Sequence, residues 1–154
     1  MGKRKVLFLV HVEEMFRRFF PDPLYPLRVR HSAMAAKYTR IIVLDSDIGE
    51  PGNDGRRGVI EEIASLPLET WSWSWGYEPG YSYDNDDPDA TWTIPSDGHE
   101  ATYVPAELRS QLDYFTQADV YIGGGCNGEC LADWECVLEY LGIPYHRVEG
   151  LIYG

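Results

Sequence analysis

Short apolar runs recur along the chain, separated by segments with helical character. Lys5 to His11 is a continuous apolar stretch rich in Val, Leu and Phe, and shorter runs follow at Ile41 to Leu44 and Val120 to Gly123. Such runs are typical of strands buried on both faces of a parallel sheet. A further strand is expected over Tyr145 to Ile152.

Helices are expected between these strands. Four segments are predicted to be helical: Arg30 to Tyr38, Gly58 to Leu66, Pro105 to Ala118, and Glu129 to Leu141. Gly142 is the natural C-cap of the fourth. Because strands and helices alternate, the sequence predicts one three-layer α/β/α domain over residues 1–154, with a mainly parallel central sheet.

Two stretches rich in turn-forming residues interrupt this pattern. Pro21 to Pro26 contains three prolines and is expected to be a loop. Asp45 to Gly55 follows a strand directly, and ligands of open α/β sheets bind outside such strand ends. Asp45 and Asp47 are therefore candidate ligand-binding residues.

An aromatic and acidic insertion is expected at about residues 71–95. Trp71, Trp73 and Trp75 alternate with serines, which predicts a strand with its three indoles on one face. That face fits the protein core or a subunit interface. Alternatively, Trp73 and its neighbours form a stacking wall for a planar ligand.

The charge distribution argues against several partners. The net charge is −12, and the first forty residues hold nine of the thirteen Lys and Arg residues but only three of the twenty-five acids. An acidic body repels phosphate backbones, so no nucleic acid partner is expected. The apolar run Val6 to Val10 is too short for a signal peptide or a membrane helix. A cytoplasmic protein is therefore expected, and three cysteines crowded within eleven residues fit a reducing compartment.

Cys130 is the strongest candidate for chemistry. It falls in the first turn of a predicted helix, after a glycine-rich turn whose backbone can approach a ligand. A helix start favours a thiolate and offers N–H groups to an oxyanion. A half-buried structural cysteine explains the same position. The candidate ligand-binding residues of the turn are Gly124, Gly125, Cys126, Asn127, Gly128 and Glu129.

The segment from Gly124 to Leu131, with Gly142 twelve residues after Cys130, resembles the signature of isochorismatase-like cysteine hydrolases. Val104 to Leu108 and Asp119 to Ile122 resemble the family's approach to that strand. The resemblance implies an isochorismatase-like fold, hydrolysis of a small molecule with Cys130 as nucleophile, and association into homo-oligomers.

The family's Asp and Lys partners are not matched. His11 stands where the aspartate is expected, and no lysine follows Lys37, so Asp97 or His99 lies nearest the lysine's place. A Cys–His pair with His11 as base is one hypothesis, in which His99 is a further candidate. A strand-end histidine bonded to a carbonyl, and an ordinary loop residue at His99, are the alternatives.

No metal or cofactor is expected. Asp45 and Asp47 lack the histidines that a metal site in this region would need. The three cysteines contain no C-x-x-C pair, and Cys130 and Cys136 point in different directions on a helix.

Three functions are compatible with the sequence. The first is a small-molecule hydrolase acting through Cys130 on an amide, imino or enol-ether-like centre. The second is a catalytically inactive relative that binds a small ligand or a partner protein. The third is a structural protein without a small-molecule site.

Overall fold

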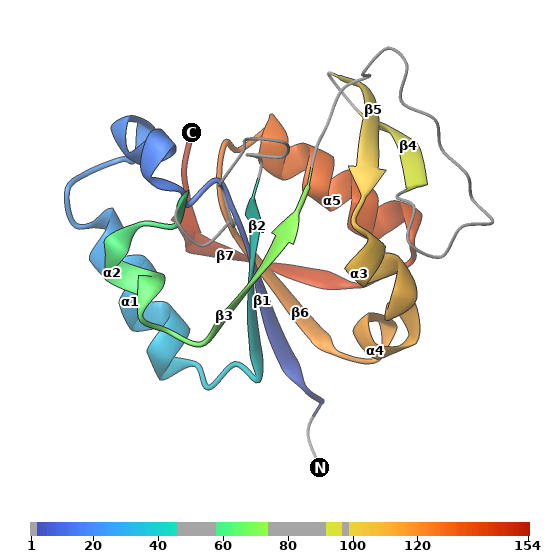
Figure 1. Cartoon of the computed structure of the whole chain (residues 1–154), viewed down its shortest axis with the longest axis horizontal. Helices are drawn as coiled ribbons and strands as arrows, with labels where there is room; N and C mark the ends of the chain where they lie inside the picture. Colours follow the sequence, from blue (N-terminus) through green and yellow to red (C-terminus); the bar gives the residue numbers. More distant parts are fainter. Residues whose placement is uncertain (1–2, 46–57, 74–91, 97–98) are drawn as a thin grey trace.

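The computed structural model describes residues 3–45, 58–73, 92–96 and 99–154. In chain order its elements are β1 (Lys5–Val10), the 3-10 helix η1 (Glu14–Phe19), α1 (Tyr25–Ala35), β2 (Arg40–Asp45), α2 (Glu61–Ala64), β3 (Leu68–Ser72), β4 (Trp92–Ser96), β5 (His99–Val104), α3 (Ala106–Ser110), α4 (Leu112–Thr116), β6 (Asp119–Gly124), α5 (Cys130–Tyr140) and β7 (Tyr145–Ile152) (Figure 1).

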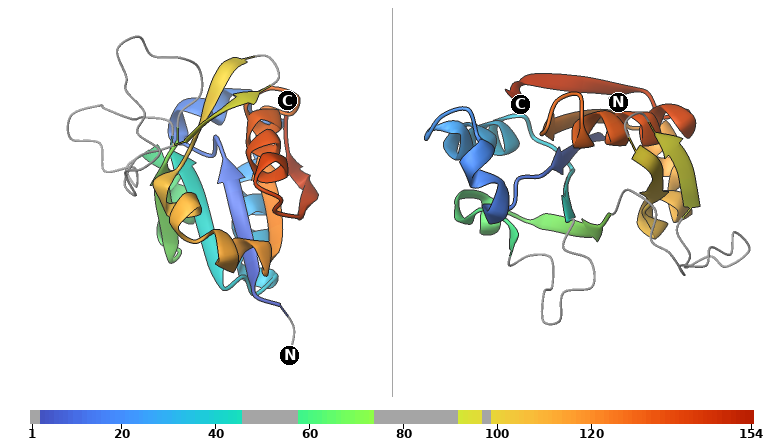
Figure 2. Two further views of the ribbon diagram at one scale, coloured as in Figure 1. Left: turned by 90° about the vertical axis from the view of Figure 1, so that its right-hand side faces the viewer. Right: turned by 90° about the horizontal axis from the view of Figure 1, so that it is seen from above.

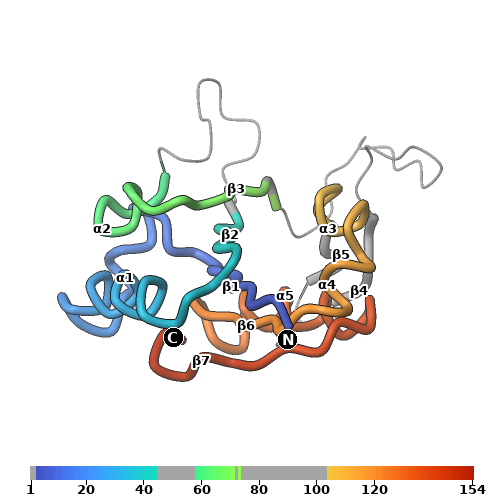
Figure 3. The backbone as a smooth tube through the Cα atoms, turned by 90° about the horizontal axis from the view of Figure 1, so that it is seen from below, coloured from blue at the N-terminus to red at the C-terminus, as the bar shows by residue number. Residues whose placement is uncertain are grey.

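A parallel five-stranded sheet forms the centre of the fold. Its strand order is β3-β2-β1-β6-β7, and each neighbouring pair is parallel. Helices α1 and α2 lie on one side of the sheet, and α3, α4 and α5 lie on the other (Figures 2 and 3). The predicted α/β class with a mainly parallel sheet is therefore confirmed.

The central strand β1 separates two apolar layers. Val6, Phe8 and Val10 pack with the core that includes α5, while Leu7 and Leu9 pack with the core beneath α1 and α2. All five side chains are buried. Alternate residues of a strand point to opposite faces, so a strand covered on both sides must be apolar at every position.

Several predicted boundaries are wrong, and the helix expected over Arg30 to Tyr38 is Tyr25–Ala35 in the structure. The expected loop Pro21 to Pro26 already contains the start of α1 at Tyr25, because proline is tolerated in a first helical turn, where its missing N–H is not needed. The expected helix Pro105 to Ala118 is split into α3 and α4 at Gln111, whose φ of −120° and ψ of 29° are not helical.

A hairpin next to α5 was not predicted. Strand β4 pairs antiparallel with β5, and both strands contact α5. Figure 1 shows the pair beside that helix. The hairpin covers a side of α5 that the sheet does not reach. Among the described residues, no helix is long and apolar enough to cross a membrane.

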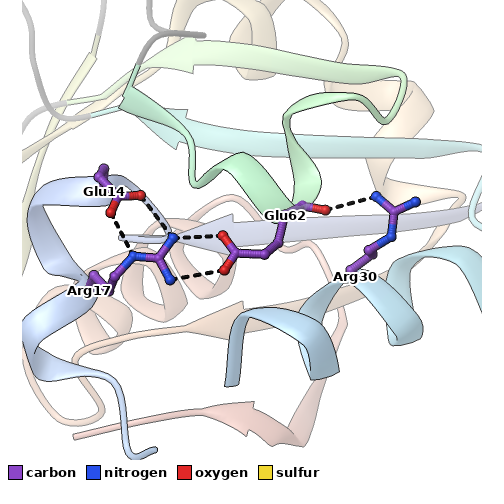
Figure 4. Close-up of polar contacts among 4 residues, drawn as sticks. All are labelled: Glu14, Arg17, Arg30 and Glu62. Carbon is purple, nitrogen blue, oxygen red and sulfur yellow. Dashed lines mark hydrogen bonds and ion pairs between the residues drawn. The ribbon is translucent and has the colours of Figure 1, made fainter. Parts of the chain in front are cut away.

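A network of charges fixes η1 against α2 (Figure 4). The Arg17 guanidinium donates to both carboxylate oxygens of Glu62, at 2.9 and 2.6 Å, and to both of Glu14, at 2.6 and 2.9 Å. Arg30 donates to the backbone carbonyl of Glu62 at 2.9 Å, which joins α1 to the same network. The network therefore holds η1 in place over the end of β1.

We expect Glu62→Gln to lower stability at neutral pH and to have little effect below the folded-state pKa of Glu62. The hydrogen bonds from Arg17 lower the pKa of Glu62 in the folded state. The stabilisation is therefore present above the unfolded-state pKa and is lost as the pH falls through the folded-state pKa. Since Arg17 is partly exposed, we expect about 0.2–1 kcal/mol. Urea unfolding at pH 7 and pH 3 measures this difference, with the exposed Glu61→Gln as control. An equal loss at both pH values would contradict it.

Candidate active site

The carboxyl ends of three central strands bring the candidate site residues to one edge of the sheet. Val10, the last residue of β1, pairs with Leu44 of β2 and Gly124 of β6. His11 follows Val10 directly, and Asp45 ends β2. Asp47 and Asp97 lie outside the described residues.

The glycine turn after β6 packs tightly against the end of β1. Gly124 has a φ of 102°, and a Cβ at this position would lie 1.9 Å from the Val10 carbonyl oxygen. The Gly125 N–H donates to the same carbonyl at 2.9 Å, and the Gly125–Cys126 peptide bond is cis. Only glycine fits at Gly124, because both the backbone conformation and the space exclude a side chain.

Tyr153 joins this turn to the end of β1. Its hydroxyl donates to the His11 carbonyl at 2.6 Å, its N–H donates to the Gly124 carbonyl at 3.1 Å, and its own carbonyl accepts from the Asn127 N–H at 2.8 Å. Its ring lies against Gly125, where a Cβ would come within 2.5 Å of it. Sequence reasoning missed Tyr153, because its partners are distant in the chain and no local pattern marks them.

Cys130 is the first residue of α5, as predicted, and its side chain is half-buried. Burial, followed by the charges of Asp133, Cys126 and Glu129, raises the pKa of its thiol to about 12, although its own backbone N–H acts in the opposite direction. This raised pKa is opposite to the expectation that the helix start would favour a thiolate. Desolvation and nearby negative groups outweigh the helix terminus.

The backbone around Cys130 differs from the expected oxyanion site. The N–H groups of Glu129 and Leu131 both donate to the Cys126 carbonyl, at 3.0 and 3.1 Å. The Glu129 N–H is thus already engaged. The Cys130 N–H, next to the sulfur, is the donor of this segment that fits a developing oxyanion.

His11 is buried beneath η1 rather than open to solvent. Its side chain is 2% exposed, and its ring stacks on Phe16 with centroids 3.9 Å apart. Nδ1 lies 3.6 Å from Oε1 of Glu13, which is also fully buried. Sequence reasoning missed Glu13, whose backbone forms an antiparallel bridge with Val59. His99 begins β5, and its side chain lies outside the description.

Asp133 is a third buried polar residue and was also missed. It lies one turn after Cys130 on α5 and is 0% exposed. The apolar stripe formed by Leu131, Trp134 and Leu138 on this helix does not include position 133. Because the β4–β5 hairpin packs on α5 in addition to the sheet, more than this one stripe is buried.

The structure places Trp73 in the protein core. Trp71 and Trp73 are both buried in the layer that includes α5, on one face as their spacing predicted. Trp73 packs edge-on against Trp134, with ring centroids 5.4 Å apart. Trp75 lies outside the described residues. In the described part of the chain, no group of three or more His, Cys, Asp or Glu side chains could hold a metal ion.

Comparison with known proteins yields a structural likeness but no sequence relative. No protein-family model matches the chain, and no curated protein matches it. The crystal structure of N-carbamoylsarcosine amidase from Thermoplasma acidophilum matches with a TM-score of 0.55 and 15% sequence identity, over 98% of this chain and 84% of that one. That amidase is an isochorismatase-like hydrolase. This chain has the isochorismatase-like fold.

Proposed function

We propose that the protein is a small-molecule hydrolase of the isochorismatase-like class with Cys130 as its nucleophile. One observation carries the proposal: Cys130 begins α5 directly after the glycine turn that ends β6, at the carboxyl edge of the parallel sheet. Ligands of open α/β sheets bind at this edge. The likeness in fold to an amidase supports a hydrolytic reaction.

The proposed substrate carries an amide, imino or enol-ether-like centre. The sulfur of Cys130 attacks that carbon, and the Cys130 N–H stabilises the negative charge on the carbonyl oxygen. Water then hydrolyses the covalent intermediate. The substrate would lie over the turn from Gly124 to Glu129, next to Asp45.

A second function is favoured by the state of the thiol. A Cys130 pKa of about 12 leaves little thiolate at neutral pH, and no lysine follows Lys37 in the sequence. Both features suit a protein that binds a small ligand or a partner protein at the same site without hydrolysing it.

We expect Cys130→Ala to lower turnover by at least about 10³-fold on any substrate that the wild type hydrolyses. N-carbamoyl amino acids, including N-carbamoylsarcosine, and simple primary amides form the test panel, with release of ammonia as the readout. Cys136→Ser, on the same helix, is the matched control and should keep wild-type turnover. Full turnover by Cys130→Ala would contradict a nucleophilic role.

The same panel tests the binding function. Compounds that raise the melting temperature of wild type and Cys130→Ala alike, without any release of ammonia, would favour a binding protein. Turnover that depends on Cys130 would exclude it.

A further inference from the structure

Asp133 is an acid in an apolar layer. Its side chain is 0% exposed, and its neighbours Leu131 and Trp134 on α5 are also fully buried. A carboxylate in such a place loses its hydration, so burial is unfavourable unless nearby groups compensate. An acid on an ordinary helix surface would face solvent. The fold instead holds this carboxyl group inside, at the end of α5 where Cys130 lies.

The spacing on the helix brings the two side chains together. Residues three apart on an α-helix are neighbours on one face. Helical side chains also lean toward the N-terminus, so an acid at position 133 is expected to lie over the turn that starts with Cys130. After burial, the charge of Asp133 is the largest cause of the raised Cys130 pKa, which agrees with this spacing on the helix.

We infer that Asp133 is the general base that takes the proton of Cys130 when the sulfur attacks. This inference rests on the proposed hydrolase function. Glu129, the other carboxylate that raises the pKa of the thiol, is exposed. His11 lies in a different setting, with its ring stacked on Phe16 and its Nδ1 directed at Glu13.

The state of the thiol explains why a base is needed. With a pKa of about 12, on the order of one thiol in 10⁵ is ionised at pH 7. The same carboxylate that suppresses ionisation before substrate binds can accept the proton during attack, because the negative charge then passes to the substrate oxygen. Repulsion in the resting site and proton transfer during the reaction are thus two effects of one group.

The proton balance closes over one turnover of an amide. As the C–S bond forms, the Cys130 proton moves to Asp133 and the carbonyl electron pair moves to oxygen. When that pair returns, the C–N bond breaks and Asp133 gives its proton to the departing amine. Water then attacks the thioester carbon and passes a proton to Asp133, the C–S bond breaks, and Asp133 returns the proton to the departing sulfur. The sum is amide plus water giving acid plus amine.

Asp133→Asn separates this role from a structural one, because two measurements should move in opposite directions. Turnover should fall about 10²–10⁴-fold, since the base is lost. Alkylation of Cys130 by iodoacetamide at pH 8 should become at least about threefold faster, since removing a negative charge lowers the thiol pKa. Mass spectrometry follows the labelling of each cysteine, with Cys136 as internal reference. Asp113→Asn, an exposed acid in the first turn of α4, is the control and should change neither value.

Each other outcome decides against the inference. Wild-type turnover in Asp133→Asn, while Cys130→Ala is inactive, overturns the role of Asp133 and leaves the proposed hydrolase standing. Unchanged alkylation shows that the two side chains are not coupled. If Asp133→Asn does not fold, Asp133→Glu keeps the charge and should keep slow alkylation and part of the turnover, and a folded but inactive Glu variant overturns the base role. A wild type that hydrolyses none of the panel overturns both proposals.

Discussion

Trp134→Ala is expected to lower the free energy of unfolding by about 3–5 kcal/mol. Trp134 is 0% exposed and packs edge-on against two rings, Phe8 at 5.0 Å and Trp73 at 5.4 Å between centroids. These contacts join α5 to β1 and to the end of β3. Alanine would leave a cavity between elements that are rigidly packed on all sides and cannot close around it.

Urea unfolding followed by circular dichroism measures this loss. Tyr140→Ala is the matched control, because Tyr140 lies on the same helix and is 64% exposed, so its loss should stay within about 0.5 kcal/mol. Trp134→Phe should fall between the two. A Trp134→Ala loss as small as that of Tyr140→Ala would show that α5 is not held through this core.

The elements predicted best are those in which successive residues have the same kind of surroundings, because such elements leave a regular pattern in the sequence. Strand β1 is apolar from Val6 to Val10 because both its faces are covered there, and β7 matches its predicted bounds Tyr145–Ile152. The start and end of α5 also carried local signals. Gly142 has a φ of 72° and follows the helix, and the Ile143 N–H donates back to the Leu138 carbonyl at 2.9 Å, as a glycine C-cap requires.

The missed residues depend on contacts between distant segments. Asp133 is buried on a helix that the β4–β5 hairpin also covers, and that hairpin was not predicted. Glu13 forms a backbone bridge with Val59. The Tyr153 hydroxyl donates a hydrogen bond to the carbonyl of His11, which is 142 residues earlier in the chain. Neither hydrophobic periodicity nor helix-capping residues in the sequence indicate such contacts. A charged residue that lies outside the apolar stripe of a helix is normally assigned to the surface.

The candidate site, too, was predicted only in part. The sequence placed Cys130 at a helix start, and the structure has it there. The helix start was expected to lower the pKa of the Cys130 thiol, whereas burial and the charge of Asp133 raise that pKa, and neither cause is visible in a local sequence pattern. The chemistry proposed for Cys130 therefore starts from a thiol that needs a base and not from a preformed thiolate.

Gly124→Ala is expected to lower the free energy of unfolding by about 3–5 kcal/mol, through strain and overlap together. Its φ of 102° is unfavourable for alanine, and the new Cβ would lie 1.9 Å from the Val10 carbonyl oxygen. The overlap would force β1 and β6 apart at the site and weaken the bond from the Gly125 N–H to Val10. Turnover by the remaining folded protein should fall as well, because this contact sets the position of the turn before Cys130.

Gly128→Ala separates the two causes. Gly128 lies in the same turn with a φ of 79°, but a Cβ there would meet nothing within 4 Å, so only the backbone strain of about 1–2 kcal/mol applies. The difference between the two variants in urea unfolding isolates the overlap at Gly124. If both variants lost the same amount, the turn would be free to move away from Val10. The close approach of β6 to β1 would then not be what positions Cys130.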